Sequence, residues 1–249
     1  HIKNQLHKFS YGKLVLGSIL IADEGINGTV SGTKKNLDLL IKEIKKILKI
    51  KKLSLKISRN KFIPFYRLKI RLKKEIVTMG NKSIKLDKLS GKHISPKDWD
   101  KIIFNKDYLV IDTRNEYEIK IGTFKNSYNP KTKSFRDFPE YIENSKIDKN
   151  QAIAMFCTGG IRCEKASSYL INKGYKNVSQ LDGGILNYLE YKKNKKKSTW
   201  NGECFVFDNR VSVNKYLDKG SHDQCYGCRH PITKADMKLK SYVKGASCK

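Results

Sequence analysis

Long hydrophobic runs are absent from this sequence of 249 residues, and no stretch approaches the length that a membrane-spanning helix needs. No signal-peptide pattern opens the sequence either. We therefore expect a cytoplasmic protein with no membrane partner. Hydrophobic residues still make up 39% of the chain, which is enough to form packed cores in two modest domains and a tail.

Acidic residues are scarce relative to basic ones. The chain has 24 Asp and Glu against 52 Lys and Arg, so its formal net charge is +28. A field of that sign attracts polyanions, and nucleic acid is the partner that such a composition favours. Codon bias is the alternative, because most of the excess is Lys in a sequence also rich in Ile and Asn. Lys-rich runs such as residues 192–197 are usually just solvated, so the charge alone decides nothing.

Cysteine and histidine are also few. Six cysteines without a secretory context favour thiol chemistry and metal binding over disulfides. The five histidines are scattered and form no convincing set of two His and one carboxylate for iron. We find no dinucleotide fingerprint and no flavin, haem or NAD motif. The chemistry that the sequence does indicate is that of a thiol.

One cysteine lies between a predicted strand and a predicted helix. Residues 153–156 form a short apolar run, typical of a strand that is buried on both faces. Residues 164–172 place Ala166, Tyr169 and Leu170 at helical spacing. Cys157 therefore lies where the free N–H groups and the dipole of a helix favour an anion. Both effects should lower the pKa of the Cys157 thiol.

The residues that follow this cysteine complete an anion-binding loop, CTGGIRC. Its glycines let the backbone curl so that several N–H groups converge on one point. Arg162 adds a fixed positive charge, and Cys163 supplies a second thiol. We predict Cys157, Arg162 and Cys163 as catalytic residues, and as the anion cradle Thr158, Gly159, Gly160 and Ile161.

The length of this loop narrows its chemistry. Four residues separate Cys157 from Arg162, one fewer than in the signature of Cys-based phosphatases. The smaller cradle suits a single sulfur atom on Cys157 better than a phosphoryl group. The loop resembles the active-site loop of rhodanese-type sulfurtransferases, in which the cysteine carries a persulfide. The alternative is a buried cysteine in a glycine turn, against which the arginine and the second cysteine argue.

Residues 1–88 predict a small basic α+β domain, similar to ferredoxin-like or acylphosphatase-like folds. The apolar residues 14–21 are followed by the turn dipeptide Asn27-Gly28, which predicts a hairpin. Apolar residues between 37 and 48 follow helical spacing with lysines between them. Residues 53–57 then alternate between apolar and polar side chains, as in a strand.

Residues 67–73 alternate strictly between basic and apolar side chains. In a strand, the apolar set would face the core and the basic set would form a ladder on the other face. Like charges on one face repel, so the ladder favours an anionic partner such as a phosphate backbone. A solvated edge strand protected by its charges competes equally. The apolar set is Leu68, Ile70 and Leu72, and the predicted RNA-binding ladder is Arg67, Lys69, Arg71 and Lys73.

Residues 89–198 predict a second domain of a different class. We expect residues 90–101 to connect the two domains and residues 109–111 to form a buried strand. That strand places Asp112 and Arg114 at its C-terminal end, where sites form in open α/β sheets. The two side chains can pair and support the pocket, and a structural ion pair is the favoured role of Asp112.

A further strand is predicted over residues 178–181, and Gly183-Gly184 then opens a helix through Tyr188. The repeated order of strand and helix predicts a doubly wound parallel sheet with helices on both faces. Rhodanese domains have this form, so the predicted fold agrees with the loop.

The tail, residues 199–249, contains two cysteines in the order Cys225-Tyr226-Gly227-Cys228, a spacing that fits one side of a tetrahedral zinc site. Cys248 is a third candidate ligand. The fourth is open: Cys204, His222 and His230 are candidates within the chain, and a cysteine after Lys249 would complete a second pair. Redox activity of the pair is the weaker alternative, because no thioredoxin-like strand and helix surround it.

Several motifs together are more specific than the loop alone. They are GINGTV, RLKKEIVTMG, DTRNEYE, CTGGIRCEKAS and GECFVFDNRVSV, at residues 25–30, 71–80, 112–118, 157–167 and 202–213. In this order they resemble the bacterial oxygen-dependent tRNA uridine hydroxylases, a family with a central rhodanese domain. The motifs extend through almost the whole chain. That family has more sequence before the position of His1 and a cysteine-rich continuation after Cys248, so the chain is expected to be a fragment.

The resemblance implies an oxidoreductase that modifies tRNA. Its members hydroxylate the wobble uridine at position 34 to 5-hydroxyuridine, with molecular oxygen as co-substrate. Cys157 matches the active-site cysteine of the family, regarded as a persulfide carrier, and Cys163 matches the second cysteine of its motif. The implied partners are tRNA and a protein that donates sulfur or electrons. Two alternatives remain: a rhodanese-type sulfurtransferase without tRNA hydroxylase activity, and a noncatalytic RNA-binding protein.

Overall fold

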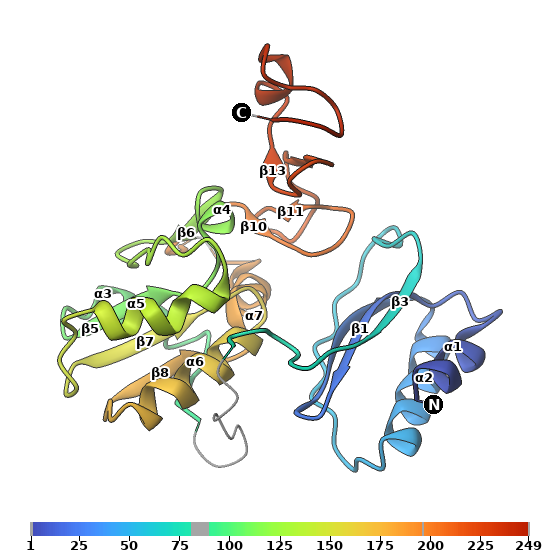
Figure 1. The fold of residues 1–249 in the computed structure, drawn as a ribbon, viewed down its shortest axis with the longest axis horizontal. Coiled ribbons are helices and arrows are strands. Elements are labelled where there is room, and N and C mark those ends of the chain that lie inside the picture. The colour runs from blue at the N-terminus through green and yellow to red at the C-terminus, as the bar shows by residue number, and fades with distance from the viewer. Residues whose placement is uncertain (1, 81–89, 196, 249) are drawn as a thin grey trace. The chain divides into compact units, whose positions relative to one another are not determined.

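A computed structural model describes residues 2–80, 90–195 and 197–248 (Figure 1). The chain forms two compact units, residues 1–78 and 79–249. The domain boundary predicted at residues 88 and 89 lies outside the described residues. Mixed α/β structure with a parallel sheet in the second unit confirms the predicted fold class.

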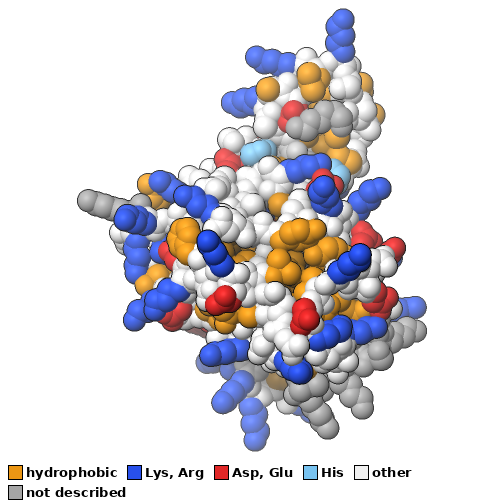
Figure 2. All heavy atoms as spheres, turned by 90° about the vertical axis from the view of Figure 1, so that its left-hand side faces the viewer, with side chains coloured by type: hydrophobic (Ala, Val, Ile, Leu, Met, Phe, Trp, Pro, Cys, Tyr) orange, Lys and Arg blue, Asp and Glu red, His pale blue; other side chains and the backbone are white. Residues whose placement is uncertain are grey.

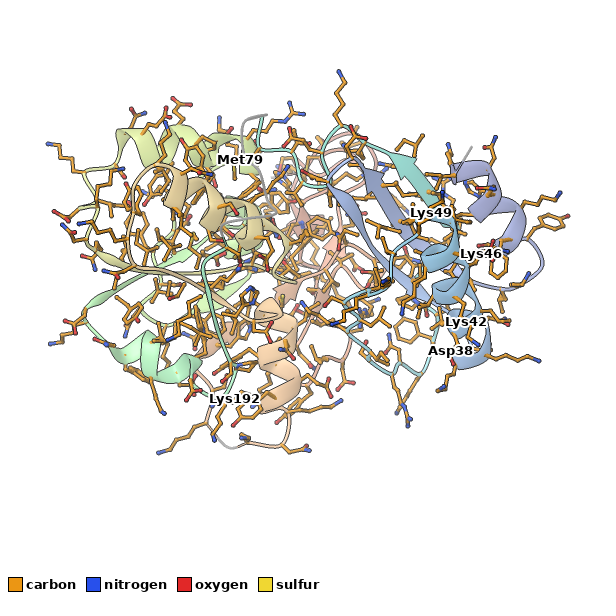
Figure 3. The ribbon with its side chains drawn as sticks, turned by 90° about the horizontal axis from the view of Figure 1, so that it is seen from below. Asp38, Lys42, Lys46, Lys49, Met79 and Lys192 are labelled. Atoms are coloured by element: carbon orange, nitrogen blue, oxygen red, sulfur yellow. The ribbon has the colours of Figure 1, made fainter. Side chains whose placement is uncertain are left out.

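The first unit is a three-stranded sheet with two helices. Strand β1 (Leu16–Ala22) lies between β2 (Gly25–Ser31), which is antiparallel to it, and β3 (Leu68–Leu72), which is parallel. Alternate residues of β1 are buried, and they meet the apolar stripes of α1 (Ile2–Ser10) and α2 (Lys34–Ile47). The lysines of α2 stay outside this core. Figure 3 shows Lys42 and Lys46 following one another along α2, with Lys49 just after the end of the helix.

The predicted hairpin is present, but its turn lies elsewhere, and one predicted strand is absent. The hairpin turns at Asp23-Glu24, and Asn27-Gly28 lies within β2, where Gly28 is opposite Ile19. A side chain at Gly28 would meet the carbonyl oxygen of Ser18 at 2.4 Å, so the glycine serves close strand packing instead of the turn. Residues 53–57 form no strand, and Leu55 and Ile57 are 47% and 86% exposed. Helix α1 was not predicted.

The predicted ladder strand exists but is shorter than expected. Arg67 and Lys73 flank β3, and Lys69 and Arg71 lie within it. The sheet order places β3 at an edge. Of the predicted core-facing residues, Ile70 is buried but Leu72 is 61% exposed, because Leu72 ends a strand that has a neighbour on only one side. The edge position is the one that the solvated-strand alternative requires.

The second unit is built on four parallel strands in the order β4-β8-β7-β5. Their bounds are Lys92–Ile94, Val178–Leu181, Ala152–Phe156 and Tyr108–Asp112. The helices are α3 (Trp99–Phe104), α4 (Glu116–Ile119), α5 (Phe138–Asn144), α6 (Ile161–Asn172) and α7 (Gly184–Lys192), with a 3-10 turn at Phe135–Asp137. Residues 90–101, predicted as a connector, instead supply the edge strand β4 and the start of α3.

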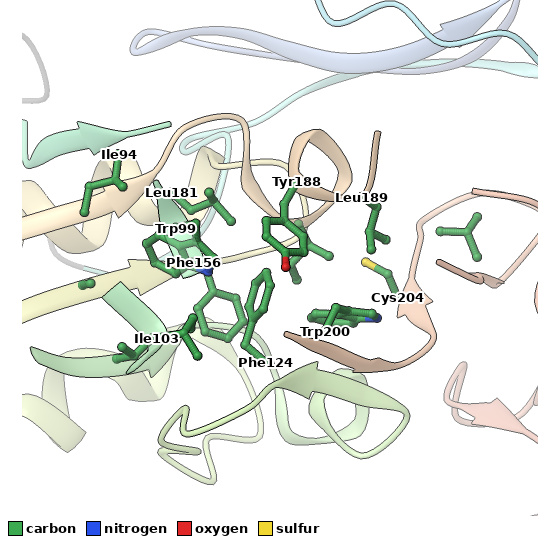
Figure 4. Packing of buried hydrophobic residues seen from close by; sticks show 14 of the residues in the cluster. Ile94, Trp99, Ile103, Phe124, Phe156, Leu181, Tyr188, Leu189, Trp200 and Cys204 are labelled. Atoms are coloured by element: carbon green, nitrogen blue, oxygen red, sulfur yellow. The ribbon is translucent and has the colours of Figure 1, made fainter. Parts of the chain in front are cut away.

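The core of this unit is rich in aromatic rings. Figure 4 shows Trp99, Phe124, Phe156, Tyr188 and Trp200 in one cluster, which joins the sheet to α3 and α7. Phe124 makes edge-to-face contacts with the other four rings at centroid distances of 4.7–5.8 Å. Because Ala154 and Phe156 face this cluster, the intervening Met155 points to the opposite face of the sheet, where it is also buried. The core thus fixes the strand that leads into the predicted active-site loop.

The C-terminal segment packs within the second unit through short strands. Strand β9 (Trp200–Gly202) pairs antiparallel with β6 (Gly122–Phe124). Two two-stranded sheets follow, β10 with β11 and β12 with β13, at Cys204–Phe205, Ser212–Val213, Asp223–Gln224 and Pro231–Ile232. A 3-10 turn follows at Asp236–Lys238. None of the helices in the described part of the chain is long and apolar enough to cross a membrane.

Candidate active site

Cys157 lies between the end of β7 and the start of α6, as predicted. Gly160 caps α6 with φ of +94°, a left-handed conformation that favours glycine, and its N–H donates to Cys157 Sγ at 3.1 Å. The N–H groups of Arg162 and Cys163 also donate to this sulfur. The loop therefore forms the predicted cradle, with backbone donors directed at the thiol.

The electrostatics of the loop separate the two thiols. Burial opposes ionisation of Cys157, but a hydrogen bond from the Cys163 thiol, the charge of Arg162 and the nearby N–H groups outweigh it and lower the Cys157 pKa to about 5. Burial raises the pKa of Cys163 well above its ordinary value, and the neighbouring Cys157 thiolate adds to the rise. At neutral pH Cys157 is therefore the thiolate of the pair, and Cys163 is the protonated thiol that donates a hydrogen bond to it.

Arg162 is held by a buried carboxylate. Glu118 in α4 is fully buried and receives the guanidinium at two points, with N–O distances of 2.6 and 2.8 Å. Burial opposes both charges, yet Arg162 lowers the pKa of Glu118 and Glu118 raises that of Arg162. Arg162 also donates to Thr158 Oγ1 at 3.3 Å. This bidentate pair fixes the positive charge beside the thiolate.

Asp112 and Arg114 pair with each other, as predicted. Arg114 is fully buried and donates to both carboxylate oxygens of Asp112, at 2.6 and 2.9 Å. Its remaining donors reach the carbonyl oxygens of Gly122 at 2.6 Å and Glu118 at 3.4 Å. Because Glu118 holds Arg162, the pair supports the pocket through α4 and does not touch Cys157 itself.

The N-terminus of α7 holds the loop from the other side. Ile185 N–H donates to the carbonyl oxygen of Cys157 at 2.9 Å, and Leu186 N–H to that of Thr158 at 3.1 Å. These bonds turn the carbonyl groups outward, so the N–H groups of the loop face the sulfur. Gly184 has φ of +68°, and a side chain there would meet Cys157 O at 2.4 Å and Gly160 N at 2.7 Å. The loop can approach α7 only because position 184 is glycine.

The comparisons with known proteins cover both units. Residues 1–76 match the UPF0176 acylphosphatase-like domain, and residues 95–191 match the rhodanese-like domain. The two domains in this order are the architecture of UPF0176 proteins. The chain therefore has a UPF0176 acylphosphatase-like domain followed by a rhodanese-like domain.

Solved structures with rhodanese domains are also similar to part of this chain. A rhodanese-related protein from Thermoplasma volcanium is 28% identical, with 40% of this chain and 92% of that chain covered and a TM-score of 0.33. A rhodanese-like domain protein from Staphylococcus aureus is 22% identical, with 39% and 90% covered and a TM-score of 0.34. A single-domain sulfurtransferase from Saccharomyces cerevisiae is 18% identical, with 45% and 98% covered and a TM-score of 0.37.

Sequence reasoning missed two residues of the site. Glu118 was quoted only as the end of a motif, although a glutamate that is fully buried needs a cationic partner such as Arg162. Phe207 lies in the C-terminal segment, and the guanidinium carbon of Arg162 is 6.0 Å from the centre of its ring. The residues around Glu118, NEYEIK at 115–120, are mostly polar and charged, so no pattern in the sequence indicated its burial. Nothing in the sequence placed Phe207 beside the loop.

The three predicted metal ligands converge. The sulfur atoms of Cys225, Cys228 and Cys248 all lie within 4.8 Å of one another. A tetrahedral zinc at ~2.3 Å from each thiolate sets the sulfur atoms about 3.8 Å apart, so the three thiols fit zinc. N–H groups of Cys228 and Gly227 donate to Cys225 and lower its pKa. Within residues 2–80, 90–195 and 197–248, no other His, Cys, Asp or Glu joins this group.

The candidates for a fourth ligand lie elsewhere. Cys204 is fully buried in the aromatic core near Trp200 (Figure 4). His222 Nδ1 is 2.7 Å from Glu203 Oε2, and the His230 ring stacks on Tyr117. Each therefore already has a structural role, and none of the three belongs to the thiol cluster.

Proposed function

We propose that this protein is an oxygen-dependent tRNA uridine hydroxylase that converts the wobble uridine to 5-hydroxyuridine, with Cys157 as its active-site cysteine. The observation that carries the proposal is the Cys157 thiolate in its amide cradle, within a chain that has both the UPF0176 N-terminal domain and a rhodanese domain. The motifs that resemble those of the tRNA uridine hydroxylases occur in both domains. The protein would act on tRNA in the cytoplasm.

The chain's own residues account for part of this reaction. The cradle stabilises negative charge on Cys157 or on one further sulfur atom bound to it, and the Glu118–Arg162 pair keeps that charge in place. Oxygen insertion at a carbon, with reduction of the second oxygen atom to water, consumes two electrons and two protons. Oxidation of two thiols to a disulfide releases two electrons and two protons. The adjacent thiols of Cys157 and Cys163 are the pair that a donor protein would recharge.

Nucleoside mass spectrometry tests this proposal. tRNA lacking 5-hydroxyuridine is incubated with the full-length protein in air and under nitrogen. We expect 5-hydroxyuridine in air only, and none with Cys157→Ser. Cys204→Ala is the matched control, because Cys204 is equally buried but lies outside the loop. Undiminished product with Cys157→Ser would exclude this thiol from the chemistry.

A plain sulfurtransferase is the second candidate, and the size of the loop favours it. The cradle accommodates one sulfur atom on Cys157, which is what transfer from a donor such as thiosulfate requires. This activity would leave the first unit without a role. Formation of thiocyanate and sulfite from cyanide and thiosulfate by the purified protein, with tRNA nucleosides unchanged, would support the second candidate and exclude the first.

We also propose a structural zinc held by Cys225, Cys228 and Cys248 with one further ligand. Thiolate ligands would give cobalt-substituted protein an intense charge-transfer absorption in the near ultraviolet. Cys228→Ser should weaken that band. The same spectrum from Cys204→Ser is the control, since Cys204 lies in the core and outside the cluster.

A further inference from the structure

Aromatic side chains lie next to the Cys157 loop, and several of them are exposed. Phe207 is 66% exposed and Tyr226 is 58% exposed, whereas the neighbouring Phe205 and Val206 are buried. Single exposed hydrophobic residues are common and need no explanation. Tyr117 stacks on His230 and is joined to Phe207 through Phe205, and Phe207 faces Arg162. Tyr226 lies in the same short loop as His230, where its ring contacts Arg229. We call Tyr117, Phe207, Tyr226 and His230 the aromatic surface.

The ring contacts come from two separate parts of the chain. Tyr117, the residue before Glu118 in α4, stacks on His230 with a centroid distance of 4.4 Å and an interplanar angle of 18°. Its edge also meets Phe205 at 5.3 Å, and Phe205 meets Phe207 at 5.2 Å. Buried Phe205 therefore anchors the exposed rings on either side of it. The surface is fixed by packing within the second unit.

Two arginines accompany these rings. The guanidinium carbon of Arg162 lies 6.0 Å from the ring centre of Phe207, and that of exposed Arg229 lies 5.6 Å from the ring centre of Tyr226. Aromatic rings interleaved with cationic groups are the feature of proteins that bind single-stranded nucleic acid, because every base has a π-face and every nucleotide has a phosphate.

We propose that the aromatic surface is a platform on which bases of a single-stranded RNA loop stack, so that one nucleotide is held at the Cys157 loop. This inference rests on the proposed function, because it takes an RNA loop as the substrate. A base that reacts at C5 has to leave its stacked neighbours, and an aromatic ring replaces the stacking that is lost. Phe207 faces Arg162 of the loop and is exposed, so we expect its ring to contribute most.

Binding of a fluorescein-labelled anticodon stem-loop RNA to the full chain tests the platform. Fluorescence anisotropy at several salt concentrations gives both the affinity and its salt dependence. Loss of one stacked base should weaken binding roughly tenfold in Phe207→Ala, with the slope of log Kd against log salt unchanged, because stacking releases no counterions. Phe207→Trp keeps a π-face and should bind like the unsubstituted chain.

Phe104→Ala is the matched control, because Phe104 is 62% exposed in the same unit but lies at the end of α3. Equal affinities of Phe207→Ala and Phe104→Ala would overturn the platform. The platform would also be overturned if Phe207→Trp bound the RNA as weakly as Phe207→Ala. Should Phe207→Ala fail to fold, Tyr226→Ala, a change at an exposed loop position, takes its place with the same two outcomes.

Failure of the proposed function and failure of the platform alone would give different results. If the unsubstituted chain neither binds the stem-loop nor forms 5-hydroxyuridine, the proposed function fails and the platform with it. If that chain binds and hydroxylates RNA while Phe207→Ala matches the control, only the platform is wrong.

Discussion

Cys157 combines complete burial with a depressed pKa, two properties that normally oppose each other. A thiol without exposed surface should be harder to ionise, yet the donors around this one outweigh that effect and lower its pKa to about 5. The largest of the favourable contributions is the hydrogen bond from Cys163. The second thiol is therefore part of what makes the first one reactive, whatever else it does.

Alkylation by iodoacetamide measures this directly. Only the thiolate reacts, so the rate at Cys157 should rise with pH, with a midpoint at about 5, and then level off. Cys163→Ala removes the thiol donor and should move the midpoint upward by roughly one pH unit. Cys204 is an internal control, because burial raises its pKa to about 12 and it should stay unmodified. An ordinary midpoint near that of free cysteine would contradict the cradle.

Glu118 and Arg162 should be inseparable. Glu118→Gln leaves a buried guanidinium without its counter-charge, which costs about 3–5 kcal/mol of unfolding free energy. Glu116→Gln is the control two residues away, because it breaks only a surface ion pair with Lys120 and should cost less than ~1 kcal/mol. Urea titration followed by tryptophan fluorescence reports on this unit alone, since Trp99 and Trp200 both lie in it. Similar losses in both variants would mean that the pair is not holding the site.

At the scale of elements, the site depends on how closely α7 approaches the Cys157 loop. Gly184 and Gly174 both have positive φ, +68° and +87°, so Ala at either position is strained by ~1 kcal/mol. At Gly174 the new methyl group meets nothing within 4 Å, whereas at Gly184 it meets the loop backbone. Gly184→Ala should therefore displace the loop and raise the alkylation midpoint of Cys157. Gly174→Ala should leave that midpoint unchanged. If the midpoint shifts equally in both variants, backbone strain alone explains the effect.

The sequence was informative where local pattern and burial coincide. The strand before Cys157 is apolar on both faces, and the glycines after it allow the tight turn of the loop. The strand and the loop could therefore both be predicted. Residues 53–57 show the opposite case, because their alternation matches a strand but no neighbouring strand pairs with them. Asn27-Gly28 has the composition of a turn, yet tertiary packing placed it within β2. Patterns that need a distant partner could not be decided from the sequence.

The candidate site shows the same division. Cys157 and Arg162 lie in one short loop, and the Asp112–Arg114 pair spans two residues, so local sequence predicted both. The contacts of Glu118 with Arg162 and of Phe207 with Arg162 join segments 44 residues apart and more. No periodicity records such contacts. They follow from the fold, which brings α4 and the C-terminal segment to the same end of the sheet.

At the scale of the whole molecule, the net charge of +28 is spread widely. On the face shown in Figure 2, Lys and Arg side chains stand among acidic and apolar ones and do not gather in one patch. Total charge therefore raises the affinity for any polyanion without selecting a site. A specific RNA contact is therefore identified by comparing two variants: removal of charges at the contact should change RNA binding, and removal of the same number of charges elsewhere should not.

The basic ladder allows that comparison. Changing Arg67, Lys69, Arg71 and Lys73 to Gln removes four charges, and if each contacts a phosphate the slope of log Kd against log salt should fall by about three. The control removes four exposed charges from the second unit, at Lys106, Lys125, Lys133 and Lys176. Both variants have the same net charge, so long-range attraction weakens equally. A slope that falls only for the ladder assigns it to RNA, whereas equal slopes mean that β3 is an edge strand kept apart from other strands by its charges.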